Sequence, residues 1–519
     1  MKDHAGQSIS IWMATATLPT FPTLAKNDHA EVCIVGAGIA GLTTAYLLGR
    51  AGKSVVVVDD GPIVSGETER TTAHLSTALD DRYFELERLH GEKGARLAAE
   101  SHASAIDEIE RIVAEEEINC DFGRLDGYLF LPPGESVEIL ERELAATHRV
   151  GLTDVRMASR SPIVTFDTGP ALQFPRQAQF HPLKYLAGLA QAIIRDGGRI
   201  YTNTHATTIE GGAPARIETR NGPVITADAV IVATNTPVND LLAIHTKQSA
   251  YRTFVIGAIV PSGLVANALY WDTCEPYHYV RLQPAPDGLS SGAPSDVLIV
   301  GGEDHKTGQA DDTEDRYSAL EEWARTRFPM MKKIEFRWSG QVMEPIDGLA
   351  FIGANPMDSD NVYIATGDSG NGMTHGTIAG MVLTDLIQGR NNPWASLYDP
   401  SRKTLSAIAR FAEENLNVAV QYADWLTAGD IDEDDSVPPG TGAIVRRGLT
   451  KIAVYCDDAG QLHTCSAICP HLGGIVAWNH SEKTWDCPCH GSRFNKFGKA
   501  INGPANTDLS PVEGSLSPE

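Results

Sequence analysis

Two cysteines and two histidines near the end of the chain have the residue types and spacing of a metal centre. Cys469 and His471 form the first pair, and Cys487 and His490 form the second. Such a set can hold one tetrahedral zinc ion. It can also hold two bridged irons, with both thiolates on one iron and both neutral imidazoles on the other. That arrangement is a one-electron carrier with a higher potential than an all-cysteine cluster.

The residues that follow each pair favour the iron cluster over zinc. Leu472-Gly473 follows the first pair, Gly491-Ser492 follows the second, and Gly503-Pro504 comes later. With these residues the chain resembles the Rieske [2Fe–2S] family over 436–519. The resemblance implies that Ser492 bonds a cluster sulfur and that the Gly503-Pro504 loop covers the cluster. The implied iron ligands are Cys469, His471, Cys487 and His490.

Two positions depart from the pattern of the high-potential members of that family. Gly474 stands where those members often have a cysteine that pairs with the middle cysteine of the second loop, so Cys489 lacks that partner. Phe494 stands where they have a tyrosine whose hydroxyl bonds a cysteine ligand. One fewer hydrogen bond to sulfur lowers the potential. We therefore expect a low-to-middle potential, and a redox titration that gave a strongly positive value would contradict this.

Three glycines close to the N terminus predict a dinucleotide site. Residues 32–35 are apolar, the glycines follow them, and a second apolar run ends at an aspartate. This order of strand, glycine turn, helix, strand and acid is typical of a Rossmann unit. In such a unit the pyrophosphate lies at the helix N-terminus and the acid bonds ribose hydroxyls. The motif alone does not distinguish FAD from NAD. The expected cofactor-binding residues are Gly36, Gly38, Ile39, Ala40, Gly41 and Asp59.

A second glycine-rich segment, much later in the chain, favours FAD. Residues 361–366 predict a strand, and a glycine turn and helix that return to the same sheet follow it. The two segments resemble the D-amino-acid-oxidase-like superfamily of FAD-dependent oxidoreductases, which includes glycine, sarcosine and glutamylputrescine oxidases, over 28–390. The fused C-terminal domain narrows this to a bacterial FAD/Rieske oxidoreductase family. The resemblance implies that the flavin pyrimidine ring faces a helix N-terminus that stabilises anionic reduced flavin, at Gly370, Asn371, Gly372, Met373 and Thr374.

A short loop after the second strand supplies two further candidates. Thr72 and His74 lie where members of the superfamily place a loop against the isoalloxazine ring. Thr72 is therefore expected to bind the cofactor, and His74 is expected to act beside the flavin. A packing or surface role for His74 stays open.

Apolar runs in the middle of the chain predict an antiparallel substrate sheet over the flavin, within about 245–340. They lie at 255–260, 277–281 and 297–305. Because alternate side chains of a strand share a face, Tyr277, Tyr279 and Arg281 point to one side. His278 points to the other. We expect the tyrosine face to line the substrate pocket, with Tyr279 as a catalytic candidate.

The segment 337–345 argues against an amino acid as the substrate. It matches the place where amino acid oxidases of the superfamily have the arginine that grips the substrate carboxylate. Depending on the alignment, Val342 or Glu344 stands there, and neither is an arginine. An amine substrate is favoured if Glu344 faces the pocket, which makes Glu344 a catalytic candidate. The alternative for Glu344 is a surface salt bridge.

The composition bounds the partners and the compartment. The 519 residues carry 42 Lys and Arg against 67 Asp and Glu, a net charge of −25, which argues against nucleic acid and anionic membranes as partners. The eight cysteines show no disulfide framework, so a cytoplasmic location is expected. No apolar run approaches the roughly eighteen residues of a membrane helix, and the short run at 9–14 predicts an ordered arm.

These motifs predict two folded parts joined by a linker. The first is an α/β FAD-binding Rossmann-like domain of the D-amino-acid-oxidase type with an antiparallel β substrate domain, and the second is a small all-β Rieske domain. Residues 404–426 predict a helix that docks on the flavin domain, because apolar side chains such as Ile408 and Leu416 recur along it. The expected boundaries are an arm at 1–27, the oxidoreductase domain at 28–400 with nucleotide-binding parts at about 28–90, 180–240 and 345–390, a helix and acidic linker at 401–435, and the Rieske domain at 436–519.

The expected activity is FAD-dependent oxidation of a small amine at a carbon that bears nitrogen. Electrons would leave the flavin one at a time through the Rieske cluster to an external acceptor protein or oxygen, because flavin can split an electron pair and the cluster accepts one electron. One alternative is reverse flow, in which a ferredoxin-type donor fills the cluster and the flavin reduces a substrate or oxygen. Another is a redox-sensing or electron-carrier protein with little turnover.

Overall fold

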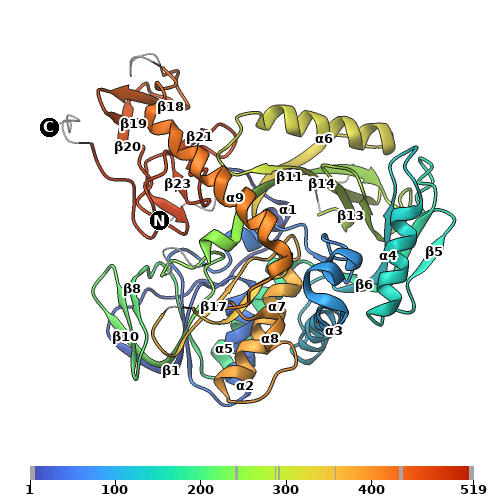
Figure 1. Cartoon of the computed structure of the whole chain (residues 1–519), viewed down its shortest axis with the longest axis horizontal. Helices are drawn as coiled ribbons and strands as arrows, with labels where there is room; N and C mark the ends of the chain where they lie inside the picture. Colours follow the sequence, from blue (N-terminus) through green and yellow to red (C-terminus); the bar gives the residue numbers. More distant parts are fainter. Residues whose placement is uncertain are drawn as a thin grey trace.

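The computed structural model describes residues 6–239, 244–286, 288–289, 293–356, 358–431 and 437–512. Within these ranges the chain forms a mostly parallel sheet, a larger mixed sheet and a C-terminal domain of short strands (Figure 1). The two large sheets share one hydrophobic core, to which β1 contributes Val32 and the mixed sheet contributes Val255 and Trp338.

The mostly parallel sheet carries both glycine-rich segments. β1 (Asp28–Val35) pairs in parallel with β2 (Val55–Val58) on one side and β10 (Val224–Val232) on the other. β2 consists of four buried valines, as expected for a strand that is covered on both faces. The order is β16-β17-β10-β1-β2-β7, with the β8–β9 hairpin attached to β10. The other strands are β7 (Arg199–Tyr201), β8 (Ala206–Glu210), β9 (Ala215–Thr219), β16 (Phe351–Ala354) and β17 (Val362–Thr366).

The helices that follow the two glycine turns pack against each other. α2 (Ile39–Arg50) follows β1, and α7 (Gly372–Ile387) follows β17. A Cβ at Gly376 would lie 2.6 Å from the Ile39 side chain, so this glycine permits the close approach. Because β1 and β17 flank β10 in parallel, both helix N-termini lie at the same edge of the sheet. Further helices are α1 (Ile11–Thr15), α3 (Tyr83–Glu115), α4 (Glu138–Arg149), α5 (Pro182–Arg195) and α8 (Ala395–Tyr398).

The larger sheet is the expected antiparallel sheet, but its strands come from a longer part of the chain than was predicted. Its order is β15-β11-β14-β13-β12-β4-β6-β3, with β5 beside β6. Four of its strands lie outside 245–340, and β4 and β12 pair in parallel. The strands are β3 (His74–Leu75), β4 (Gly123–Phe130), β5 (Arg156–Ala158), β6 (Ala171–Gln179), β11 (Gln248–Pro261), β12 (Leu269–Asp272), β13 (His278–Pro284), β14 (Ser295–Lys306) and β15 (Ile334–Pro345).

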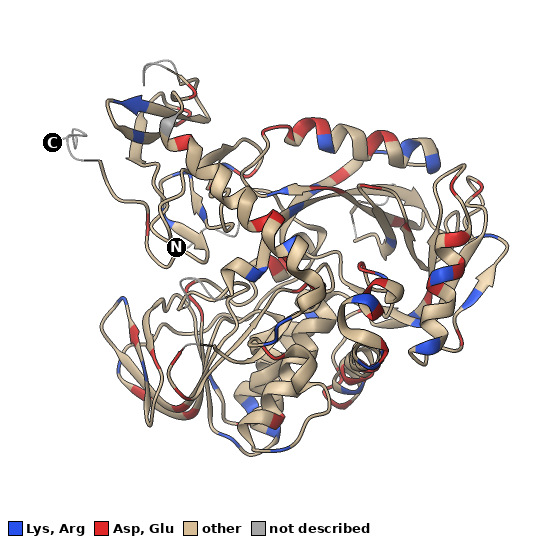
Figure 2. Ribbon diagram, viewed as in Figure 1, with Lys and Arg blue, Asp and Glu red and all other residues tan. Residues whose placement is uncertain are grey.

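α6 (Thr313–Arg327) covers one face of this sheet and carries charged side chains along its length (Figures 1 and 2). Tyr317 and Leu320 are buried against the sheet, whereas Glu321 and Arg325 form an exposed ion pair of 2.7 Å. Such surface pairs contribute little to stability. Among the described residues, no helix has the length and apolar character needed to cross a bilayer.

The C-terminal domain consists of two small antiparallel sheets, in agreement with the predicted all-β fold. Trp485 and Phe494 are fully buried in its core. One sheet contains β18 (Thr441–Arg447), β19 (Thr450–Cys456) and β20 (Leu462–Ser466). The other contains β21 (Ala477–Asn479), β22 (Thr484–Asp486), β23 (Arg493–Asn495) and β24 (Ala500–Asn502).

A buried glutamate joins this domain to the rest of the chain. Glu482 is fully buried and lies 3.3 Å from Arg70 and 3.3 Å from Arg252, both of the oxidoreductase part. It also accepts hydrogen bonds from the Ser8 backbone at 3.1 Å and from the Ser339 hydroxyl at 2.5 Å. The N-terminal arm, the mixed sheet and the C-terminal domain therefore meet at one carboxylate.

The predicted helix at 404–426 is present as α9 (Ile408–Gln421) with a short 3₁₀ turn at each end. It docks through polar side chains: Glu414 lies 2.6 Å from Lys306, and Asn417 accepts a hydrogen bond from Gln309. Its apolar side chains face outward, with Leu416 67% exposed. The helix therefore docks on the flavin domain as predicted, but through polar side chains and not through its apolar face.

Candidate functional site

A large cavity lies where the N-termini of α2 and α7 meet. The positive ends of two helices at one cavity suit an anionic group such as a diphosphate. Gly41 and Thr374 lie outside the wall, and the Thr374 hydroxyl is instead 2.8 Å from Nδ1 of His102. The other predicted cofactor residues line the cavity: Gly36, Gly38, Ile39, Ala40, Asp59, Thr72, Gly370, Asn371, Gly372 and Met373.

The first glycine turn holds Asp59 at the cavity. Gly36 has a φ of +108°, a conformation that other residues rarely adopt. A Cβ at Gly41 would overlap the carbonyl oxygen of Gly36, so this glycine lets the helix approach the strand. The Asp59 carboxylate accepts hydrogen bonds from the N–H groups of Ala37 at 2.8 Å and Gly61 at 2.9 Å.

His74 and Tyr279 also line the cavity, from β3 and β13, which are not adjacent in the order of the mixed sheet. Their rings are 5.7 Å apart in an edge-to-face arrangement, and His74 Nδ1 lies 3.1 Å from the Thr72 hydroxyl. Burial, with Arg281 nearby, lowers the pKa of His74 to about 3, so the ring is neutral. His74 Nε2 and Asn235 Nδ2 are buried and have no geometrically defined hydrogen-bond partner within the described part of the chain. Both residues line the cavity, so a bound cofactor could satisfy these atoms.

The predicted alternation along 277–281 is present. Tyr277 and Tyr279 line the cavity. Arg281 is fully buried and donates hydrogen bonds to the carbonyl oxygens of Thr72 at 3.2 Å and Ala73 at 2.8 Å. Arg281 therefore holds the loop that carries His74, and it is not available to bind a substrate carboxylate.

Val342 and Glu344 are the two residues that stand, depending on the alignment, where amino acid oxidases of the superfamily have the arginine that binds the substrate carboxylate. Val342 lines the cavity, whereas Glu344 lies behind the wall and accepts a 2.9 Å hydrogen bond from the Ser369 hydroxyl. The arginine among the lining residues that the structure describes is Arg70, which is paired with Glu482. No arginine of the described wall is thus placed to grip a carboxylate.

An aspartate that the sequence analysis did not single out faces the cavity beside the tyrosines. Asp80 accepts a 3.1 Å hydrogen bond from the Tyr277 hydroxyl and lies against Gly370. Burial raises the pKa of Asp80 to about 6. A buried carboxylate near the ends of two substrate-sheet tyrosines can bind a cation.

Two loops of the C-terminal domain bring the four predicted metal ligands together. The backbone N–H of Cys469 donates a 2.8 Å hydrogen bond to the carbonyl oxygen of the residue that closes the first loop. The backbone N–H of Cys487 does the same in the second loop, also at 2.8 Å. The two thiols lie within hydrogen-bonding distance of each other. The rings of His471 and His490 are 5.0 Å apart, and His490 Nδ1 is buried without a hydrogen-bond partner. Two thiols beside two imidazoles, one with an unsatisfied nitrogen, fit a two-iron cluster.

The surroundings of these loops agree with the predicted secondary contacts. The Ser492 hydroxyl is hydrogen-bonded to Cys469 and accepts from the Ala505 N–H at 3.0 Å, which ties the Gly503-Pro504 loop to the ligand loops. A Cβ at Gly474 would lie 2.6 Å from Cys489 Sγ. All eight cysteines, each within the described ranges, are unbridged. The low-to-middle potential stays a prediction.

The same loop also closes the large cavity. Residues of 500–506 form part of its wall. Asn502 donates a 2.8 Å hydrogen bond to Glu67, and Asn506 donates one of 3.0 Å to the carbonyl oxygen of Ala206. On the neighbouring ligand loop, Gly491 accepts a 3.0 Å bond from the Gln341 side chain. The cavity and the metal site of one chain are therefore adjacent.

Comparison with known families identifies both parts. The model of the FAD dependent oxidoreductase family (DAO) matches residues 31–386, and the Rieske [2Fe-2S] domain model matches residues 427–513. The chain therefore belongs to the FAD dependent oxidoreductase family. This oxidoreductase carries FAD and a Rieske [2Fe–2S] cluster, and the zinc alternative is wrong because the C-terminal match is to a Rieske domain.

Several relatives share this architecture in whole or in part. The Rieske 2Fe-2S iron-sulfur protein YhfW of Bacillus subtilis is 32% identical over 97% of each chain. The gamma-glutamylputrescine oxidoreductase of Escherichia coli is 27% identical over 71% of this chain and 86% of its own length. Among solved structures, glycine oxidase from Geobacillus kaustophilus superposes with a TM-score of 0.58 at 18% identity, covering 73% of this chain and all of the glycine oxidase.

Replacement of Gly41 tests the assigned cradle. Gly41→Val is expected to yield oxidoreductase that lacks FAD after purification, because the added side chain would overlap the Gly36 carbonyl oxygen and push α2 away from the turn. Flavin content per chain is the measurement. Gly49→Ala in the same helix is the matched control, since nothing lies within 4 Å of its Cβ position. Full FAD content in Gly41→Val would contradict the assignment.

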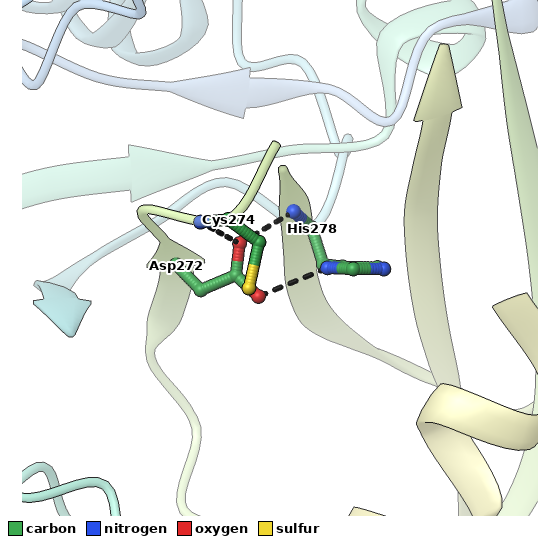
Figure 3. Close-up of side chains that lie close together, drawn as sticks. All are labelled: Asp272, Cys274 and His278. Carbon is green, nitrogen blue, oxygen red and sulfur yellow. Dashed lines mark hydrogen bonds and ion pairs between the residues drawn. The ribbon is translucent and has the colours of Figure 1, made fainter. Parts of the chain in front are cut away.

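One further cluster of possible metal ligands lies between β12 and β13, at Asp272, Cys274 and His278 (Figure 3). Its groups already bond each other: the Asp272 carboxylate is 2.9 Å from His278 Nδ1 and accepts from the backbone N–H of both other residues. Burial raises the pKa of the Cys274 thiol to about 12, so it is not a thiolate. The cluster therefore closes a turn on the side of the sheet opposite to the tyrosines.

Proposed function

We propose that the protein oxidises a small cationic amine with its FAD and passes the electrons one at a time through its own Rieske cluster to an external acceptor. The observation that carries the proposal is the cavity wall, which combines Asp80 with residues of the Rieske loop at 500–506. One cavity thus offers a carboxylate for a cationic substrate and direct contact with the iron–sulfur domain.

The ionisation of the buried acids favours Asp80 as the group that binds the cation. With a pKa of about 6, Asp80 is mostly ionised at neutral pH. Burial, with Asp81 and Asp80 close by, raises the pKa of Glu344 well above its usual range, which favours its neutral form. In this proposal Glu344 therefore affects the site only through the residues around it and does not bind the substrate itself.

The lining of the cavity also favours an amine over an amino acid. The Escherichia coli relative is named for gamma-glutamylputrescine, and the Geobacillus structure is named for glycine. Val342 faces the cavity where a carboxylate-gripping arginine was expected, and Arg281 is occupied by backbone carbonyls. Val342 and Arg281 therefore support an amine, and not an amino acid, as the substrate.

The residues of this chain bind, orient and shield, since FAD when bound supplies a two-electron acceptor that can release electrons singly. Asp80, positioned by Tyr277, pairs with the ammonium group. Tyr279 and Trp271, which pair across β12 and β13, supply an aromatic wall beside His74, with ring centroids 5.7 and 5.9 Å from its ring. His74 remains neutral, because burial lowers its pKa, and its ring lies at the cavity wall.

Anaerobic mixing of the holoprotein with primary, secondary and N-methylated amines tests the proposal. Bleaching of the flavin followed by the EPR signal of the reduced cluster is the expected result, and it would also identify the substrate class. If dithionite alone produced both changes, amine oxidation would be abandoned. Reduction of the cluster by a ferredoxin-type donor, followed by flavin reduction, would then support reverse flow.

Asp80→Asn is expected to raise KM for the confirmed amine about tenfold to a hundredfold, because a charge-assisted contact to the ammonium group is lost. In the wild type, KM should rise as the pH falls below about 6, since protonation removes the same charge. The variant should lose this pH dependence. Steady-state kinetics provide the measurement, with Glu344→Gln as the comparison. A larger rise in KM for Glu344→Gln than for Asp80→Asn would contradict the assignment.

A further inference from the structure

A buried histidine of the oxidoreductase domain touches both histidine ligands of the Rieske site. His245 lies just before β11 and is 3% exposed. Its ring centroid is 4.8 Å from that of His471, at an interplanar angle of 80°, and 6.1 Å from that of His490. The ligand histidines therefore face the oxidoreductase domain of their own chain at this point.

A chain of buried polar groups continues from His245 to the cavity wall. His245 Nδ1 lies 3.4 Å from the Thr236 hydroxyl, which accepts a 3.4 Å hydrogen bond from the Gln248 side-chain amide. Gln248 is in turn 3.2 Å from the hydroxyl of Thr366, a residue of the cavity wall. Thr236 and Gln248 are buried. A Cβ at Gly503, in the Rieske loop, would lie 3.2 Å from Thr236, so the two domains meet along this chain.

We propose that His245 is the contact through which electrons cross between the FAD cavity and the Rieske cluster, held in place by Thr236 and Gln248. His245 is a positioning residue that acts on the cluster ligands, and the inference rests on the proposed function only for the direction of flow. Oxidation of the amine to the imine releases two electrons and two protons. With both cofactors bound, the electrons would cross singly, and each would reduce the cluster by one electron. A one-electron carrier outside the protein reoxidises the cluster before the second electron crosses.

This contact gives both ligand histidines a packing partner in the oxidoreductase domain. Partners beyond the metal ligands orient those ligands, and their loss costs about 10- to 100-fold in function. Without His245, the rings of His471 and His490 would face a void or water in place of a packed ring. The electron would then have to cross the domain boundary at this point without the packed ring of His245.

Light-driven reduction of the flavin with EDTA as the electron donor tests the inference without any substrate. The holoprotein is illuminated anaerobically, flavin bleaching is followed by absorbance, and the cluster signal is followed by freeze-quench EPR. In the wild type the cluster signal should follow bleaching at a rate independent of protein concentration. In His245→Phe the cluster signal should lag about tenfold or more behind bleaching, with iron content and g values retained. His463→Phe is the matched control, because His463 lies in the Rieske domain and bonds Asp457 at 3.1 Å.

A His245→Phe protein whose cluster follows the flavin as fast as in the wild type would overturn the inference. If that variant loses its iron, Thr236→Val decides, since it removes only the hydroxyl beside His245. A lag in Thr236→Val with an intact cluster supports the path, and no lag overturns it. A wild type in which light reduces flavin and then cluster, while no amine bleaches the flavin, would refute the proposed substrate and leave the path standing.

Discussion

Glu482→Gln is expected to lower the free energy of unfolding by about 3–5 kcal/mol, the cost of removing one partner from a buried ion pair. The fully buried carboxylate faces Arg70 and Arg252, both at 3.3 Å, and neither guanidinium has access to water. Burial alone would raise the pKa of Glu482, but the arginines lower it below its usual range. The neutral amide leaves two buried cations without their counter-charge, so the Rieske domain should separate from the oxidoreductase domain first.

Thermal and denaturant unfolding of the holoprotein, with cluster EPR as a second probe, measures this effect. Glu413→Gln on the outer side of α9 makes the same chemical change at an exposed position and should leave the transition in place. Because the pKa of Glu482 is lowered on folding, its contribution is present above the ordinary carboxylate range and is lost only as the pH falls. An unchanged transition in Glu482→Gln would show that the network does not hold the domains together.

Cys487→Ser is expected to remove the cluster and keep the flavin. Iron content should fall from about two atoms per chain to near zero, since the site needs both thiolates on one iron. The EPR signal of the reduced cluster should disappear, and turnover with one-electron acceptors should be lost. FAD content should stay as in the wild type, because Cys487 does not line the cavity.

Cys489→Ser separates ligation from general damage to the loop. Cys489 is two residues away, its sulfur lies against Gly474, and it forms no disulfide. This variant should keep both irons. If Cys489→Ser lost the cluster and Cys487→Ser retained it, the ligand assignment of the second loop would be wrong.

Local motifs could be predicted from the sequence because their chemistry is set within a few residues. The turn at Gly36 and the helix N-terminus at Gly372 follow from spacing alone, and both line the cavity. The two ligand loops follow for the same reason. Each requires only a short stretch of backbone with its own hydrogen bonds.

Contacts between distant segments could not be predicted in this way. Asp80 follows no motif and becomes a candidate only because Tyr277, far away in the chain, donates a hydrogen bond to it. Glu344 was a candidate from its place in the sequence, but its position behind Ser369 depends on how β15 lies relative to α7. The face through which α9 docks is set by polar contacts such as the ion pair between Glu414 and Lys306. The spacing of apolar residues along the helix does not predict this face.

The bond between Ser8 and Glu482 also bears on how the protein is made. A chain leaves the ribosome N-terminus first, so Arg70 and Arg252 emerge well before the glutamate that neutralises them. The N-terminal arm cannot reach its final position until the Rieske segment has been synthesised, because Ser8 bonds that segment through both its N–H and its hydroxyl. The Rieske domain, which is translated last, therefore supplies a contact that the flavin domain needs. A messenger truncated before the Rieske segment would yield a flavin domain that exposes two cations where the Rieske domain normally covers them.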